Sequence, residues 1–214
     1  MKKKYISLPK HHFSYSQWQL WIKDPARYRS LYFDGRADLN WSNRGQTFGK
    51  QVADALEMGQ DTGDVLTDSA MLLLPKYDVQ DQPIEVEVKT KHGWLNLLAK
   101  PDTYNSTTHE FIEFKTGKGH NPWTAKKAQD HLQMWFYAVV IWQKYGVVLD
   151  NALLAWMETE DTPEGIKPTG RVDTFTVHFS KAGLMDALAR IIKSANEIQI
   201  AWASHITTPY VTTF

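Results

Sequence analysis

The spacing of apolar residues along the 214-residue chain predicts a mixed α/β fold. In residues 84–88 apolar and acidic positions alternate, which is the period of a half-exposed strand. Short apolar runs predict further strands at residues 71–74, 94–99, 109–115, 152–157 and 172–179. The polar turn at residues 105–108 predicts that 94–99 and 109–115 pair as an antiparallel hairpin.

Apolar residues at helical spacing predict helices at both ends of the chain and one between the strands. Ser14 is the expected cap of the first, Pro25 opens the second, and residues 43–58 form a third. A long helix is expected over residues 124–145, and another from Ser180 to about 204. This order predicts a single domain over 1–214, with a helical segment at 14–58 and a central mixed sheet flanked by helices.

The composition excludes several classes of protein but does not identify one function. The formal net charge is zero, whereas a protein that only coats nucleic acid is usually basic. The chain has no cysteine, which excludes disulfides and cysteine-held zinc or iron–sulfur clusters and fits a reducing cytoplasm. No apolar run is long enough to span a membrane, and the basic start is not followed by the apolar stretch of a signal peptide.

The residues with the clearest chemistry lie between 98 and 118. Glu113 and Lys115 are two apart in a predicted strand, so their side chains leave the same face. Asp102, at the end of the preceding strand, approaches that face if the hairpin is tight. Two carboxylates that converge beside an ammonium group are costly unless they bind a hard cation such as Mg²⁺. The alternative is that Glu113 and Lys115 form an ordinary surface pair on an edge strand.

Gln133 and Tyr137 lie on the long predicted helix and are four residues apart. They therefore share one helix face and can point into one cleft. A buried amide at Gln133 needs hydrogen-bond partners, and this argues against a purely structural role for the residue. Tyr137 has the alternative of ordinary core packing.

These residues together resemble the PD-(D/E)XK phosphodiesterase superfamily and, within it, the RecB-like nucleases. Pro101-Asp102 stands at the P-D motif, residues 113–115 at E-x-K, and Gln133 to Tyr137 at Q-x-x-x-Y. Residues 15–17 and 24–28 are similar to the S-x-S and C-P-x-x-Y opening of that branch, with Asp24 in place of cysteine. The motifs follow one another in the family's order over about three fifths of the chain.

The resemblance implies a restriction-endonuclease-like core, dependence on Mg²⁺ or Mn²⁺, and DNA as the substrate. It assigns Asp102, Glu113 and the backbone carbonyl of Phe114 to the metal. Lys115 would be the catalytic lysine, orienting or helping to deprotonate the attacking water and stabilising charge at phosphorus. Gln133 and Tyr137 would orient the substrate.

The sequence departs from the family at two points. The histidine of the family's G-x-x-x-H pattern is absent, because Gly49 stands four residues after Gly45. Glu57, eight residues further along the same predicted helix, could supply a carboxylate to the metal instead; the alternative is a solvated residue at a helix end. The lack of cysteine also separates the chain from members of the family that hold an iron–sulfur cluster.

A cluster of lysines with one indole follows the E-x-K motif. Lys118, Trp123, Lys126 and Lys127 are candidates for phosphate contact and base stacking, or else belong to a solvated loop and helix start. His109, His120 and His131 are spaced by eleven residues, which matches no compact zinc motif.

The sequence thus predicts a Mg²⁺-dependent deoxyribonuclease. Exonuclease action is favoured over endonuclease action on the resemblance alone. Recombination, repair or processing of phage or mobile-element DNA is the expected setting, with a recombination or single-strand-binding protein as a possible partner. The alternative is a nuclease-like fold that binds DNA or a partner protein without efficient cleavage.

Overall fold

The computed structural model describes residues 3–36, 79–80, 83–163 and 165–207, with the backbone alone for 79–80 and 165–168. The strand predicted at 71–74, the helix predicted at 43–58 and the candidate ligand Glu57 lie outside the described residues.

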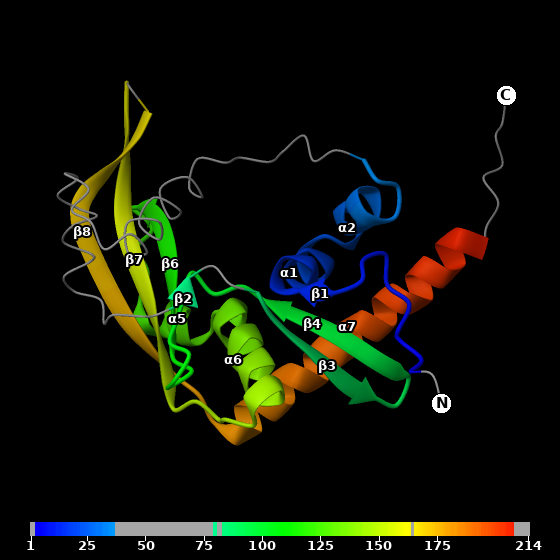
Figure 1. The fold of residues 1–214 in the computed structure, drawn as a ribbon. Coiled ribbons are helices and arrows are strands. Elements are labelled where there is room, and N and C mark those ends of the chain that lie inside the picture. The colour runs from blue at the N-terminus through cyan, green and yellow to red at the C-terminus, as the bar shows by residue number, and fades with distance from the viewer. Residues whose placement is uncertain (1–2, 37–78, 81–82, 164, 208–214) are drawn as a thin grey trace, which may run out of the picture.

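The described strands form two mixed sheets, which confirms the predicted mixed α/β class (Figure 1). The smaller sheet has the order β1-β4-β3, and its strands are β1 (Phe13–Ser14), β4 (Gly93–Ala99) and β3 (Ile84–Thr90). The larger has the order β2-β5-β6-β7-β8, and its strands are β2 (Val79–Gln80), β5 (Thr103–Tyr104), β6 (Phe111–Lys118), β7 (Asn151–Thr162) and β8 (Gly165–His178). In the larger sheet β6 and β7 are parallel, and the other neighbouring strands are antiparallel.

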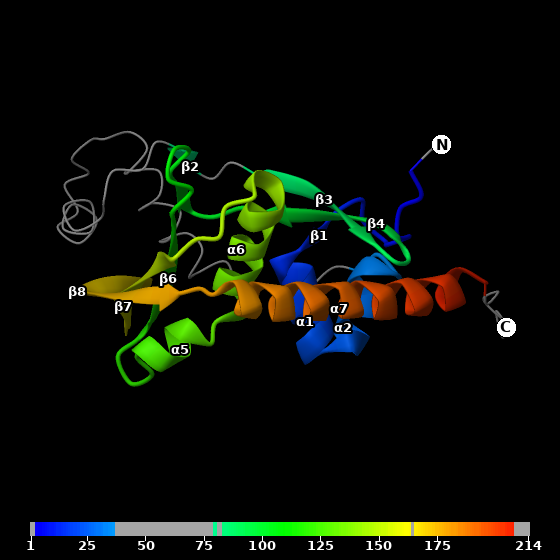
Figure 2. The same ribbon diagram turned by 90° about the horizontal axis from the view of Figure 1, so that it is seen from below.

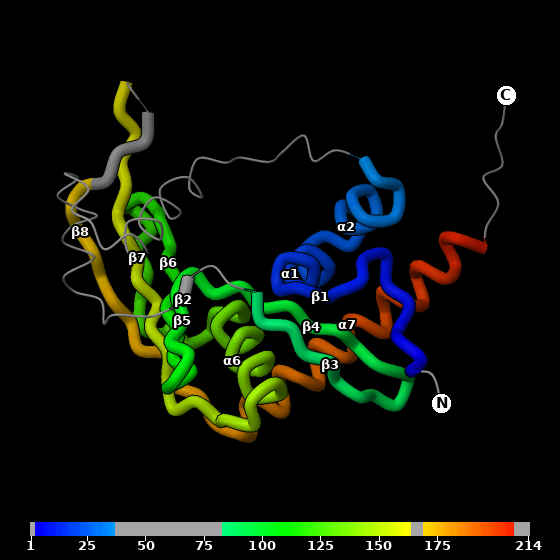
Figure 3. The backbone as a smooth tube through the Cα atoms, in the orientation of Figure 1, coloured from blue at the N-terminus to red at the C-terminus, as the bar shows by residue number. Residues whose placement is uncertain are grey.

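The predicted hairpin between 94–99 and 109–115 is wrong. Strand β4 instead forms a hairpin with β3, in which Ile84 lies opposite Ala99. The chain then leaves the smaller sheet, and the turn at 105–108 joins the two-residue strand β5 to β6, as the tube in Figure 3 shows. The sequence signal for that turn was sound, but a strand of two residues is too short to show an apolar period.

The connection between the parallel strands β6 and β7 contains two helices, where the sequence predicted one. They are α5 (Ala125–Gln129) and α6 (Leu132–Tyr145). The Gln129 side chain both donates to and accepts from the backbone of His178 in β8, at 2.7 and 2.9 Å. The indole of Trp135 also donates to the Gln129 carbonyl, at 2.8 Å. These tertiary contacts tie the end of α5 to β8 and satisfy a carbonyl that the helix leaves unpaired.

Helix α6 is the centre of the fold. It lies between the two sheets in Figures 1 and 2, and it contacts β3, β4, α1 and α7. Six of its apolar residues are fully buried: Met134, Phe136, Ala138, Val139, Val140 and Ile141. A helix that is apolar on nearly all sides is covered on nearly all sides. It ends as predicted at Gly146, whose φ of 76° is left-handed.

Helices α1 (Tyr15–Lys23) and α2 (Pro25–Tyr32) pack near the long helix α7 (Lys181–Thr207), which runs along the molecule in Figure 2. The indole of Trp18 donates to Ser194 and that of Trp21 donates to Glu197, each at 3.1 Å. The two donors are three residues apart on α1 and the two acceptors are three residues apart on α7, so the two bonds join the same faces of these helices. Of the described helices, none is long and apolar enough to cross a membrane.

The starts of α1, α2 and α7 agree with the predicted positions. Ser180 caps α7 through a bond from the Gly183 amide at 3.1 Å. Asp24 caps α2 by accepting from the Arg27 amide at 2.9 Å. Ser14 precedes α1 but its side chain makes no capping bond.

Gly93 permits a close crossing of the N-terminal segment over the β3–β4 turn. Its φ is +141°, and a Cβ there would lie 2.7 Å from the Lys4 carbonyl oxygen. We expect Gly93→Ala to destabilise the fold by roughly 2–3 kcal/mol, through backbone strain and this overlap. Gly146→Ala is the control, because its φ is also positive but its Cβ would meet nothing within 4 Å, so strain alone should cost about 1 kcal/mol. Urea unfolding measures both; equal losses would contradict the role of the close crossing.

Candidate active site

Glu113 and Lys115 come from the interior strand β6, between β5 and β7. The Lys115 Nζ lies 2.5 Å from Glu113 Oε1. Glu113 is only 3% exposed, and the Lys115 side chain is 24% exposed. The shared face that their spacing predicts is confirmed, and the alternative of a surface pair on an edge strand is wrong because the carboxylate is buried inside the sheet.

Asp102 reaches this pair from the segment that crosses between the two sheets. Its Oδ2 accepts a hydrogen bond of 2.7 Å from the backbone amide of Phe114. The pairing of Thr103 with Ile112 brings the two segments together. The expected approach of Asp102 to Glu113 therefore occurs, through the short strand β5 and not through a hairpin with β4.

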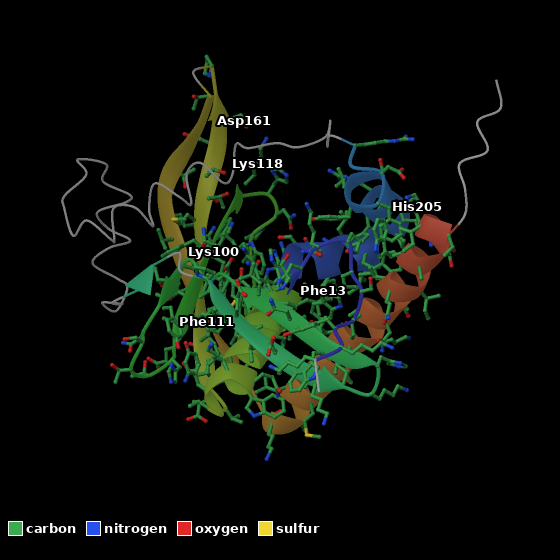
Figure 4. All side chains as sticks on the ribbon, turned by 45° about the vertical axis from the view of Figure 1, so that its right-hand side comes forward. Phe13, Lys100, Phe111, Lys118, Asp161 and His205 are labelled. Atoms are coloured by element: carbon green, nitrogen blue, oxygen red, sulfur yellow. The ribbon has the colours of Figure 1, made fainter. Side chains whose placement is uncertain are left out.

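Gln133 and Tyr137 bring the central helix α6 into the same cluster. The Gln133 amide nitrogen donates to Glu113 Oε1 at 2.5 Å and to the Tyr137 hydroxyl at 2.9 Å. The Tyr137 hydroxyl in turn donates to the carbonyl of Lys100 at 2.9 Å, and Lys100 is labelled in Figure 4. Both side chains are nearly buried. The partners that a buried amide needs are thus the carboxylate and the phenol, and Tyr137 combines core packing with a polar contact.

The electrostatics of Glu113 are unusual for a carboxylate. Burial, and after it the neighbouring charge of Asp102, raise its pKa to about 8 against the opposing effects of Lys115 and Gln133. Its second oxygen, Oε2, is buried and has no hydrogen-bond partner among the described residues. Burying a carboxylate oxygen without a hydrogen-bond partner costs free energy, so the neighbouring protein groups do not fully satisfy the hydrogen-bonding capacity of Glu113.

This arrangement fits a hard divalent cation. The unpartnered Glu113 Oε2 and the neighbouring Asp102 carboxylate are oxygen donors of the kind that Mg²⁺ prefers. Within the described ranges, no group of three or more His, Cys, Asp or Glu side chains is gathered as a metal site. Two carboxylates are nevertheless sufficient for Mg²⁺, which keeps several waters. The Phe114 carbonyl and Glu57 stay predictions as further ligands.

The candidate nucleic-acid residues fall into two groups. Lys127 lies with its Nζ 4.8 Å from the centre of the Trp123 ring, at the start of α5. Lys126 forms an exposed pair with Asp130 one helical turn on. Lys118 pairs with Asp161 on β7, near the far part of the β7–β8 hairpin (Figure 4). Strand alternation puts Lys118 on the opposite sheet face from Glu113, so the structure does not bring it to the carboxylates.

The sequence reasoning missed the place of His131. It lies at the break between α5 and α6, with its Nε2 3.4 Å from the Gln133 amide oxygen. Trp123 packs edge-on against its ring at 5.0 Å. The predicted continuous helix over 124–145 gave no reason to single out His131. The observed break between α5 and α6 turns this side chain toward the site.

Comparisons with known proteins bear on the fold. No family model matches the chain, and no curated protein sequence matches it. A crystal structure from Eubacterium rectale, of a protein provisionally named an exonuclease, matches 91% of this chain and 82% of its own, with 11% identity and a TM-score of 0.58. The two chains share a fold. At this identity the likeness shows the fold alone.

Two other solved structures are similar over most of their length. An alkaline exonuclease from Laribacter hongkongensis has 14% identity, 90% coverage of both chains and a TM-score of 0.46. A phage-related exonuclease from Haemophilus somnus has 12% identity, covers 92% of this chain and 98% of its own, and has a TM-score of 0.47.

Proposed function

We propose that this chain is a metal-dependent nuclease that hydrolyses phosphodiester bonds in DNA. The observation that carries the proposal is the buried Glu113 carboxylate, which has one oxygen bound by Lys115 and Gln133 and the other without a partner. A carboxylate in this state beside Asp102 is arranged for a cation. The exonuclease name of the Eubacterium rectale protein, which has the same fold, supports the same class of activity.

The metal is proposed to be Mg²⁺ or Mn²⁺, held by Asp102, Glu113, the Phe114 carbonyl and Glu57. When bound, such an ion polarises a phosphoryl oxygen and lowers the pKa of water. The Phe114 amide keeps Asp102 Oδ2 engaged at 2.7 Å, which fixes the orientation of that carboxylate. Its geometry is therefore set before any ion or substrate arrives.

The other residues act on orientation and charge. Lys115 contacts Glu113, and its partly exposed side chain can face a bound phosphate. There it would orient water and stabilise the added negative charge at phosphorus. Gln133 and Tyr137 are already engaged with Glu113 and the Lys100 carbonyl. Their proposed contribution is to hold the carboxylate and the crossing segment where the DNA strand must pass.

We further propose exonuclease action in recombination or processing of phage or mobile-element DNA, with a recombination or single-strand-binding protein as partner. The motif resemblance and the name of the Eubacterium rectale protein favour exonuclease action over endonuclease action. The biological setting rests on the resemblance.

Incubation with linear, circular and single-stranded DNA tests the function. Each substrate is combined with Mg²⁺, with Mn²⁺ and with a chelator. We expect linear DNA to shorten with metal, circular DNA to resist, and the chelator to stop the reaction. Cleavage of circular DNA would replace exonuclease with endonuclease. Binding without cleavage under every condition would refute the nuclease and leave a nuclease-like DNA-binding protein.

Lys127 is expected to contact a DNA phosphate from its place beside Trp123. Lys127→Ala should weaken DNA binding about 3- to 10-fold. It should also reduce the slope of log K against log salt by about 1, because the variant releases one fewer counterion from the DNA when it binds. Fluorescence anisotropy over a salt series, with the metal chelated, measures both. Lys193→Ala is the control, since that exposed lysine lies on α7 beside Glu197. An unchanged salt slope for Lys127→Ala would contradict the contact.

A further inference from the structure

The break between α5 and α6 places the His131 side chain beside the active-site cluster. The proposed reaction gives this side chain no role. His131 has an extended backbone, with φ −73° and ψ 111°, between the two helical segments. Had the helix continued, this residue would have kept a helical position. The break instead brings its Nε2 to 3.4 Å from Gln133 Oε1.

The hydrogen bonds around Gln133 determine which of its amide atoms faces His131. A metal-binding carboxylate only accepts hydrogen bonds, so the Gln133 nitrogen must face Glu113 Oε1. The Gln133 oxygen then faces His131, and an amide oxygen only accepts. His131 must therefore carry its proton on Nε2 to complete the chain from imidazole to amide to carboxylate.

The surroundings of His131 keep its ring neutral and in place. The rings of Trp123 and Tyr15 pack edge-on against it, at 5.0 and 5.9 Å between centroids. Burial lowers its pKa to about 4, and the Lys115 charge adds to that effect. A neutral imidazole has one N–H donor, and the Gln133 amide oxygen lies close enough to accept from it.

We propose that His131 is a positioning residue of the nuclease site, which holds the Gln133 amide so that Glu113 Oε1 is engaged and Oε2 is left for the metal. This rests on the proposed function. It gives the helix break a purpose that the predicted continuous helix could not serve. Groups that orient a metal ligand from behind typically change metal affinity or activity by 10- to 100-fold when removed.

Two substitutions separate the hydrogen bond from packing. His131→Phe keeps a ring and removes the donor, whereas His131→Gln keeps a donor near the position of Nε2. We expect His131→Phe to weaken Mn²⁺ binding and to lower kcat by about 10- to 100-fold, with KM for DNA changed less. His131→Gln should recover most of the loss. His205→Phe, on the far part of α7, is the matched control and should leave both quantities unchanged.

A double substitution tests whether His131 acts through Gln133. If it does, His131→Phe should cause no further loss of kcat in a Gln133→Ala background, because the intermediary is already gone. Independent, additive losses would overturn the proposal. So would equal losses for His131→Phe and His131→Gln, or wild-type Mn²⁺ affinity in His131→Phe.

The tautomer of His131 provides a test that does not depend on activity. Nitrogen-15 NMR of the metal-free protein at pH 9.5, above the pKa of Glu113, should show a neutral ring with the proton on Nε2. A proton on Nδ1 would overturn the proposal even if the enzyme is active. A wild-type protein that neither cleaves DNA nor binds Mn²⁺ would instead refute the proposed function, which keeps the two failures distinct.

Discussion

Glu113→Gln is expected to abolish DNA cleavage, by at least about 10³-fold, while making the metal-free protein more stable at pH 8.5. Glutamine has the same size but cannot supply the second anionic oxygen to a cation. Loss of activity together with a gain in stability is the signature of a residue kept for function against the preference of the fold. Simple structural damage would lower both.

The sign of the stability change follows from the pKa of Glu113. Burial raises that pKa to about 8 in the folded protein, from an ordinary value of 4.5. The folded state therefore holds this proton more tightly than the unfolded state, and the wild type loses stability as pH rises from about 4.5 through 8. Glutamine stays neutral, so its advantage should grow over that range to a few kcal/mol, an order-of-magnitude figure.

Urea unfolding with chelator at pH 5.5 and pH 8.5, for wild type and Glu113→Gln, measures this difference. The exposed Glu110→Gln is the matched control and should show neither effect. Cleavage by Glu113→Gln within tenfold of wild type would contradict the assignment. A difference in stability that shrinks as pH rises would contradict the burial argument.

Lys115→Ala is expected to lower kcat by about 10²- to 10⁴-fold while Mn²⁺ binding is retained at high pH. The ammonium is the positive group beside the carboxylate, so its loss removes charge stabilisation at phosphorus. It also removes one of the effects that lower the pKa of Glu113, and this alone would weaken metal binding at neutral pH.

Raising the pH separates these two consequences. If Lys115 served only to keep Glu113 ionised, activity of Lys115→Ala would return toward wild type between pH 7 and pH 9.5. We expect Mn²⁺ binding to recover over that range and kcat not to recover. Full activity at pH 7 would show that the lysine is wrongly assigned, and full recovery at pH 9.5 would reduce its role to that of a charge partner.

The elements that the sequence predicted well are those whose signal is local. Alternation in residues 84–88 marks β3, the strand predicted at 152–157 lies within β7, and the strand predicted at 172–179 overlaps the second half of β8. The strand pairing was predicted less well. Strand β5 has two residues and carries no period, so its pairing with β6 could not be seen, and β4 was given the wrong partner.

The site divides in the same way. Glu113 and Lys115 share a face because strands have a period of two, and Gln133 and Tyr137 share a face because helices turn in 3.6 residues. The sequence by itself determined these two pairs. Only the tertiary structure decided that Asp102 meets the Phe114 amide, that Glu113 is buried with a raised pKa, and that a helix break presents His131 to Gln133. Those features depend on contacts between segments that no local periodicity encodes.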